Sequence, residues 1–171
     1  LEIQNNNLAK RPLGHVIYAA GLTAEFRTRL GETVNAHACL LEKTLNFSHW
    51  NSWLYLSSTR VYSSDHSNYP VKEERPIYTS PSADMVYNIS KLLGESLCLA
   101  RPEKTCRVAR LSNVFGERMP AENFLAAILH DASFKKIVEI EEGENSSRDY
   151  ISVQQASKDI VSIALNGRHR L

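Results

Sequence analysis

A tyrosine and a lysine four residues apart, Tyr87 and Lys91, form the most informative pair in the sequence. In a helix, residues at this spacing lie on one face, one turn apart. A tyrosine phenol has a pKa of about 10 and is a poor base at neutral pH. A neighbouring ammonium favours the phenolate and lowers that pKa, so the pair predicts a base that takes a proton from a hydroxyl while a hydride leaves the same carbon. A motif this short also arises by chance, and alone it is weak evidence.

A serine hydroxyl would complete a catalytic group. Ser58 directly follows the apolar run 53–57 and precedes the helix predicted over 84–100. A hydroxyl at this place can donate to and accept from a substrate oxygen, steadying it as it becomes a carbonyl. The alternative is a strand-end serine that satisfies its own turn. Position alone favours the two interpretations equally.

The elements that must position these residues alternate along the chain. Short apolar runs predict strands over 15–20, 53–57, 107–111, 137–140 and 150–153. Apolar residues at helical spacing predict helices over 32–45, 84–100, 123–131 and 154–165. Asp84 is the expected N-cap of the second of these helices. The polar stretch 62–81 predicts a long functional loop.

Strands that alternate with helices predict an α/β fold, doubly wound around a parallel sheet. In such sheets ligands bind beyond the carboxyl ends of the strands. The loops after Ala20, Ser57 and Leu111 are therefore where we expect the chemistry.

Composition excludes several other classes of protein. A formal charge of +1 over 171 residues indicates neither a nucleic-acid partner nor an anionic membrane surface. No apolar stretch approaches the roughly 18 residues of a membrane span. Three dispersed cysteines favour a reducing compartment over a disulfide scaffold, and the histidines fall singly, without metal-ligand spacing. We therefore expect a cytoplasmic protein with no metal site.

Six segments in order resemble the extended short-chain dehydrogenase/reductase family, the NAD-dependent epimerases and dehydratases that include UDP-galactose 4-epimerase. They are HVIYAAGLT, VNAHACLLE, WLYLSSTRVY, MVYNISKLLGE, RVARLSNVFGERM and SRDYISV. The resemblance covers about His15 to Leu165 and implies a Rossmann-like fold. It also implies an NAD or NADP cofactor, a nucleotide-sugar substrate and a homodimer in the full-length form.

The resemblance implies roles for individual residues. Ser58, Tyr87 and Lys91 match the catalytic group, and Lys91 would also hold the ribose of the nicotinamide half of the cofactor. The segment that passes beside the cofactor is matched by Ala19, Ala20 and Gly21.

Three further positions have weaker assignments. Asn35 matches an asparagine at the start of a helix behind the cofactor; its alternative role is to cap that helix. Asn113 and Arg148 match residues that contact the diphosphate of the nucleotide sugar. A guanidinium fork suits that task, whereas the alternative for Arg148 is a local pair with Asp149.

The sequence departs from the family in its first part. The glycine-rich turn that seats the cofactor pyrophosphate is absent, and the seven glycines are scattered. We therefore expect residues 1–120 to be a dinucleotide-binding domain that lacks its first strand and glycine-rich turn. Residues 121–171 would be part of a substrate-binding lobe followed by a returning helix. We expect these 171 residues by themselves to bind NAD(P) weakly or not at all, and to self-associate or depend on further residues.

A second departure bears on the reaction. In the dehydratases and decarboxylases of the family an acidic residue follows two places after the catalytic Ser or Thr, and here that place is Arg60. A cation cannot serve as the acid or base for water elimination. The sequence therefore favours a 4-epimerase or a ketosugar reductase. The alternative is a non-catalytic dinucleotide-sensing or scaffolding relative, which the intact Ser58, Tyr87 and Lys91 disfavour and the absent glycine-rich turn favours.

Overall fold

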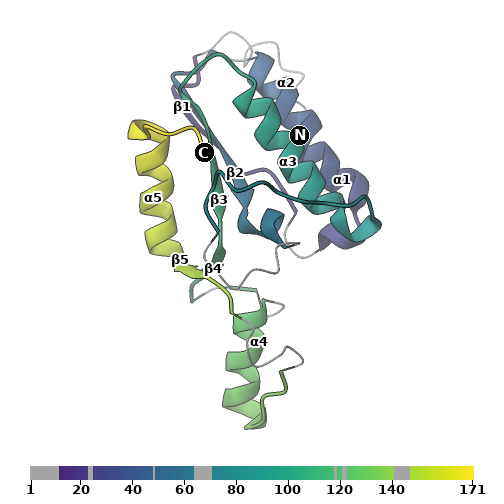
Figure 1. Cartoon of the computed structure of the whole chain (residues 1–171). Coiled ribbons are helices and arrows are strands. Elements are labelled where there is room, and N and C mark those ends of the chain that lie inside the picture. Colours follow the sequence, from purple (N-terminus) through teal and green to yellow (C-terminus); the bar gives the residue numbers. More distant parts are fainter. Residues whose placement is uncertain are drawn as a thin grey trace. The chain divides into compact units, whose positions relative to one another are not determined.

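The computed structural model describes residues 12–22, 25–47, 49–63, 71–117, 119–120, 123–140 and 147–171. The chain forms two compact units. The first unit comprises residues 1–111 and 159–171, and the second comprises residues 112–158. Figure 1 labels the elements of both.

The first unit is built on a parallel sheet of three strands in the order β1-β2-β3. The strands are β1 (His15–Tyr18), β2 (Ser52–Ser58) and β3 (Cys106–Leu111). Trp53 of β2 pairs with Val16 on one side and Cys106 on the other. Three of the predicted strands are therefore present, and their parallel order confirms the α/β fold.

Helices cover both faces of this sheet, as Figure 1 shows. On one face lie α1 (Leu30–Val34), α2 (Leu40–Phe47) and α3 (Val86–Leu99); a π-helical turn, Asn35–Cys39, joins the first two without a break. On the other face lies the C-terminal part of α5 (Val153–Asn166), where the Ser52 hydroxyl donates to the Ala164 carbonyl at 2.6 Å. The helices on both faces are those expected of a doubly wound fold.

The core of the first unit lies between β2 and the helices. Leu41, Trp53 and Tyr55 are almost fully buried there. Gly94 lets α3 lie unusually close to β2, because a Cβ at this position would be 2.5 Å from the hydroxyl oxygen of Tyr55. The sheet and α3 are therefore held at short range, which fixes the side chains that α3 presents towards β2.

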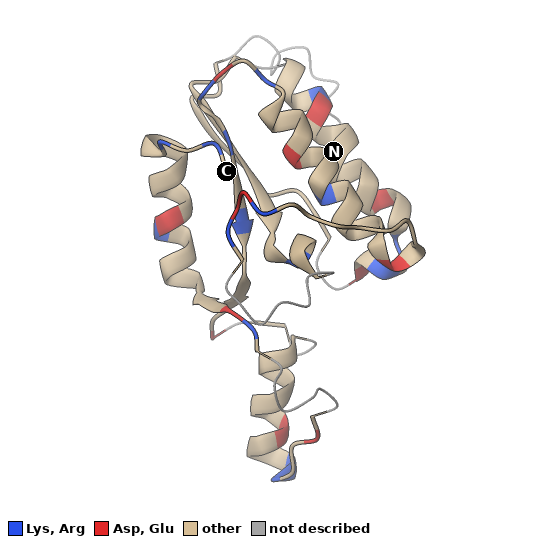
Figure 2. Cartoon of the chain, viewed as in Figure 1, with Lys and Arg blue, Asp and Glu red and all other residues tan. Residues whose placement is uncertain are grey.

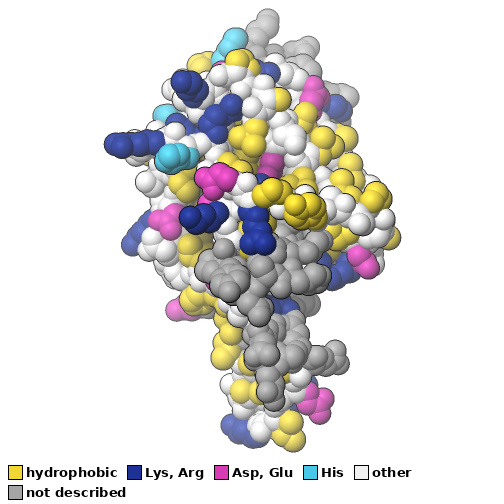
Figure 3. All heavy atoms as spheres, viewed as in Figure 1, with side chains coloured by type: hydrophobic (Ala, Val, Ile, Leu, Met, Phe, Trp, Pro, Cys, Tyr) yellow, Lys and Arg dark blue, Asp and Glu magenta, His cyan; other side chains and the backbone are white. Residues whose placement is uncertain are grey.

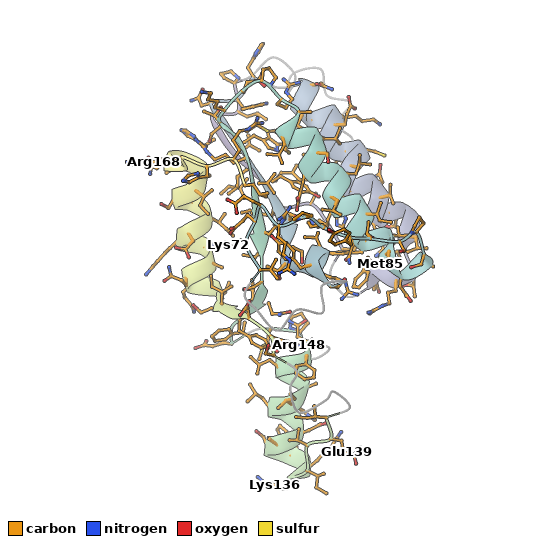
Figure 4. All side chains as sticks on the ribbon, viewed as in Figure 1. Lys72, Met85, Lys136, Glu139, Arg148 and Arg168 are labelled. Atoms are coloured by element: carbon orange, nitrogen blue, oxygen red, sulfur yellow. The ribbon has the colours of Figure 1, made fainter. Side chains whose placement is uncertain are left out.

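The second unit contains a pair of parallel strands and one helical segment. The strands are β4 (Asn113–Phe115) and β5 (Tyr150–Ser152), and α4 (Phe124–His130) continues into a π-helical turn, Asp131–Lys135. Lys136 has a left-handed backbone with φ of 60°, which ends the helix. Lys136 and Glu139 are labelled beyond α4 in Figure 4.

Two local predictions were wrong. Residues 137–140 form no strand: the apolar side chains of Ile137, Val138 and Ile140 are exposed, and no strand of the described residues pairs with them. Asp84 caps no helix, because it lies inside a 3-10 turn, Ala83–Met85, and Met85 is the N-cap of α3. The strand β4 was not predicted, since its three residues look like part of a turn.

Charges of both signs lie along the helices of the first unit (Figure 2). On the face shown in Figure 3, basic, acidic and hydrophobic side chains are interspersed. None of the helices within the described residues has the length and apolar character needed to cross a membrane.

Candidate active site

Ser58 lies where β2 ends and a 3-10 turn, Thr59–Tyr62, begins. Its Oγ accepts a hydrogen bond from the backbone N–H of Arg60 at 3.2 Å, so the serine does satisfy its own turn. Tyr87 lies close enough to this hydroxyl for hydrogen bonding from Ser58 to lower the pKa of its phenol. A hydroxyl has one proton and two lone pairs, so the two interpretations of Ser58 are compatible.

Tyr87 and Lys91 lie one turn apart on α3, as their spacing predicted. The start of this helix is marked by Met85 in Figure 4. The Tyr87 ring packs on Phe26, with 4.7 Å between ring centroids, and meets the His37 ring edge-on at 5.0 Å. The Lys91 ammonium nitrogen lies 6.0 Å from the centre of the Tyr87 ring. The structure therefore brings Ser58, Tyr87 and Lys91 together at the carboxyl end of β2.

The ammonium of Lys91 is buried, with only 6% of the residue exposed. It donates to the Leu56 carbonyl at 2.8 Å and lies 5.1 Å from the centre of the Tyr55 ring. Burial lowers the pKa of Lys91 to about 8, and the negative charge of Glu95 opposes this shift. A lysine of this kind can change its protonation near neutral pH far more readily than an exposed one.

The pKa of Tyr87 moves in the direction opposite to the prediction. Burial raises it, and the hydrogen bond from Ser58 and the positive charge of Arg60 only partly oppose that rise. The prediction counted a nearby ammonium and omitted the cost of enclosing a phenolate between aromatic rings. Arg60 is the cation that acts on this phenol: its guanidinium carbon lies 5.9 Å from the centre of the Tyr87 ring and 5.0 Å from that of Phe26.

The segment predicted to pass beside the cofactor follows β1. Ala19 and Gly21 are exposed, and Ala20 is half-buried. A Cβ added at Gly21 would lie 3.0 Å from Nε2 of His37 and 3.8 Å from Nζ of Lys91. Gly21 thus approaches the Lys91 ammonium, and the absence of a side chain keeps the space between them open.

Asn35 does not stand at the start of a helix. It is the C-cap of α1 and the first residue of the π-helical turn, with helical φ and ψ of −58° and −46°. The helix begins earlier, at Leu30, so the capping interpretation of Asn35 was wrong. Its proposed place behind the cofactor stays a prediction.

Asn113 and Arg148 belong to the second unit. The side-chain amide of Asn113 donates to the Asp149 carbonyl at 3.0 Å, which ties β4 to β5. The guanidinium carbon of Arg148, labelled in Figure 4, lies 4.4 Å from the centre of the Phe124 ring. Their expected contact with a diphosphate stays a prediction.

A buried ion pair behind the site was missed from the sequence. Both oxygens of the Glu95 carboxylate accept from Arg110, at 3.0 and 2.6 Å, and Oε1 also accepts from the Ser57 hydroxyl at 2.5 Å. The Arg110 guanidinium also donates to the Tyr62 hydroxyl and to the Glu73 carbonyl. A glutamate four residues after Lys91 was a visible signal, because that spacing places both on one face of the helix.

His37 was also missed, and the sequence held no signal for it. A single histidine in an apolar helix is indistinguishable from a core histidine until its neighbours are known. In the part of the chain that the structure describes, no group of three or more His, Cys, Asp or Glu side chains could hold a metal ion.

The sequence profile of the NAD dependent epimerase/dehydratase family matches residues 8–169. The chain therefore belongs to the NAD dependent epimerase/dehydratase family, and the predicted resemblance is confirmed. No curated protein matches the sequence.

Three of the solved structures with a similar fold are described here. RMD from Pseudomonas aeruginosa, complexed with NADPH, is 25% identical with a TM-score of 0.67, over 89% of this chain and 56% of that one. The dTDP-glucose 4,6-dehydratase from Bacillus anthracis, in complex with NAD, is 21% identical (TM-score 0.68; 99% and 55% covered). The UDP-glucuronic acid 4-epimerase from Bacillus cereus, in complex with NAD, is 16% identical (TM-score 0.71; 89% and 49% covered). The chain spans about half the length of these proteins.

Proposed function

We propose that this chain carries the catalytic group of an NAD(P)-dependent enzyme that oxidises or reduces a sugar carbon of a nucleotide sugar. The observation that carries the proposal is the grouping of Ser58, Tyr87 and Lys91 at the carboxyl end of β2. This is the edge where open α/β sheets bind their ligands. Family membership supports the same reaction class.

The residues present fit a dinucleotide. The Lys91 ammonium has three N–H bonds, and the one to Leu56 leaves N–H groups that can bind a ribose hydroxyl. Gly21 lets such a ligand approach, because a side chain there would crowd His37. When bound, the cofactor accepts or returns the hydride.

The chain's own groups handle the proton. Tyr87 takes the proton of the sugar hydroxyl, while Ser58 hydrogen-bonds the same oxygen as it gains carbonyl character. Burial alone would raise the pKa of Tyr87 further above its ordinary value. The Ser58 hydrogen bond and the Arg60 charge lower this pKa and so favour the phenolate that acts as the base. The Lys91 ammonium lies 6.0 Å from the centre of the same ring.

The proposed reaction is 4-epimerisation or ketosugar reduction, not dehydration. Arg60 occupies the place of the acidic residue of dehydratases, and its guanidinium lies against the rings of Phe26 and Tyr87. A guanidinium stays protonated at any working pH and cannot carry out the proton transfers that water elimination requires.

The test is a product assay on the protein as its gene encodes it. Nucleotide hexoses and 4-ketosugars are incubated with NAD or NADP, and the products are identified by NMR and mass spectrometry. We expect a 4-epimer or a reduced sugar, and no loss of water. Loss of water at enzymatic rates would overturn the assignment of the reaction, and no change in any substrate would favour a non-catalytic role.

A further inference from the structure

The buried side chain of His37 lies inside the candidate site without a role in the proposed chemistry. It comes from the π-helical turn between α1 and α2 and is 0% exposed. Its ring meets Tyr87 edge-on, and its backbone carbonyl accepts a hydrogen bond from the Tyr55 hydroxyl at 3.3 Å. Both contacts fix the position of the imidazole.

The hydrogen bonds around Ser90 define the tautomer of His37. The Ser90 hydroxyl donates its only proton to the Tyr87 carbonyl at 2.9 Å. Nδ1 of His37 lies 2.9 Å from the same oxygen, which can then only accept. The proton of the neutral imidazole is therefore on Nδ1, and Nε2 carries an unshared electron pair.

That electron pair has no hydrogen-bond partner among the described residues. Nε2 faces the space beside Gly21, and Nζ of Lys91 borders the same space: both lie within 4 Å of the point where a Gly21 Cβ would be. An acceptor without a partner in a protein interior lowers the stability of the fold. An acceptor close to a buried ammonium can instead stabilise its positive charge.

We infer that His37 is a positioning residue for Lys91, with Nε2 accepting a hydrogen bond from a water that in turn accepts one from the ammonium. The contact orients the lysine between the Leu56 carbonyl and the cofactor side of the site. It also stabilises the charged form of the amine, because a neutral imidazole presents the negative end of its dipole. The inference rests on the proposed function only in that Lys91 belongs to the catalytic group.

The environment of Lys91 contains several other groups that act on its charge. Glu95 and Tyr87 face it from α3, and Tyr55 faces it from β2. Burial lowers the pKa of Lys91, and Glu95 opposes that shift. The burial and the Lys91 charge lower the pKa of His37 to about 3, so the imidazole stays a neutral acceptor at working pH. The contribution of His37 to the pKa of Lys91 is therefore measured as the difference in that pKa between variants at position 37.

The variants are His37→Gln and His37→Phe. A glutamine can place its amide oxygen near the position of Nε2 and still accept, whereas a phenylalanine fills the volume without an acceptor. The pKa of Lys91 is measured by NMR on protein with isotope-labelled lysine, with Lys91→Met used to assign the signal. We expect His37→Phe to lower this pKa by about one unit, a tenfold change in proton affinity, and His37→Gln to keep most of the original value. Equal values in wild type and His37→Phe would overturn the inference.

A second measurement uses the unaltered protein and so does not depend on a variant that folds. The ¹⁵N shifts of the His37 ring should show a protonated Nδ1 and an unprotonated Nε2. A proton on Nε2 would contradict the inference. Neither experiment needs turnover. If the Lys91 pKa falls in His37→Phe but the protein has no nucleotide-sugar activity, the proposed function is refuted and this inference stands.

Discussion

Two polar clusters lie along α3 and differ in how completely their atoms are paired. The inner cluster is Ser57, Glu95, Arg110 and Tyr62, in which each carboxylate oxygen of Glu95 accepts from Arg110. The site cluster is Ser58, Tyr87, Lys91 and His37, in which Nε2 of His37 has no partner among the described residues. Buried groups that are fully paired stabilise a fold, whereas incompletely paired ones are costly and are usually kept for function. We therefore assign the first cluster to the scaffold and the second to the chemistry.

The largest effect is expected when one partner is removed from the inner cluster. Arg110→Met leaves the Glu95 carboxylate buried, where its side chain is only 4% exposed. We expect the free energy of unfolding, measured with urea, to fall by about 3–5 kcal/mol. The double variant Glu95→Gln/Arg110→Met should recover part of the loss, because it removes the unpaired charge as well. A loss below about 1 kcal/mol would show that the pair is not part of the scaffold.

A second prediction concerns the pH dependence of stability, to which the buried Lys91 of the site cluster should contribute. Burial lowers the pKa of Lys91 from 10.5 to about 8 in the folded protein. Between these two pH values the unfolded chain binds more protons than the folded one, so the free energy of unfolding contributed by Lys91 rises with pH.

The measurement for this second prediction is urea unfolding from pH 7.5 to 10.5, a range set by the pKa values of Lys91. The wild type is compared with Lys91→Met. The difference between their free energies of unfolding, plotted against pH, gives the contribution of Lys91. Stability that falls with pH in the difference curve would contradict the burial of a charged Lys91.

The smallest expected effect is that of Arg60 on Tyr87. The charge of Arg60 lowers the pKa of Tyr87, so Arg60→Gln should raise it further and move the acid limb of the pH–activity profile to higher pH. The shift should be less than about one unit and should shrink in high salt, because Arg60 is exposed. Arg27→Gln is the matched control, since Arg27 packs on the same Phe26 ring. A shift to lower pH in Arg60→Gln would contradict the assignment.

Much of the first unit could be predicted from the sequence, because burial imposes a visible pattern. The strands β1, β2 and β3 are apolar runs, and α3 repeats its buried residues at helical spacing. The false strand at 137–140 shows the limit of the same rule, since an apolar run forms a strand only beside a partner. In β4 the three residues carry too little pattern to be detected.

The positions of Ser58, Tyr87 and Lys91 could be predicted, but their electrostatics could not. Spacing shows that Tyr87 and Lys91 share a helix face, but it does not show that Phe26 and His37 enclose the phenol. That enclosure raises the pKa of Tyr87, whereas the sequence, which shows only the nearby ammonium, predicted a lower pKa. Likewise, the tautomer inferred for His37 depends on its contact with Ser90, 53 residues away in the chain. Such contacts are known only from the folded structure.

The central claim is that Tyr87 exchanges the proton of the sugar hydroxyl, and Tyr87→Phe tests it most directly. The variant keeps the ring that packs on Phe26 and removes only the hydroxyl. Tyr78→Phe is the matched control, because Tyr78 is 78% exposed. In the product assay, kcat should fall by roughly 100-fold or more in Tyr87→Phe and stay unchanged in Tyr78→Phe, with both variants folded by circular dichroism. An unchanged kcat in a folded Tyr87→Phe variant would contradict the account.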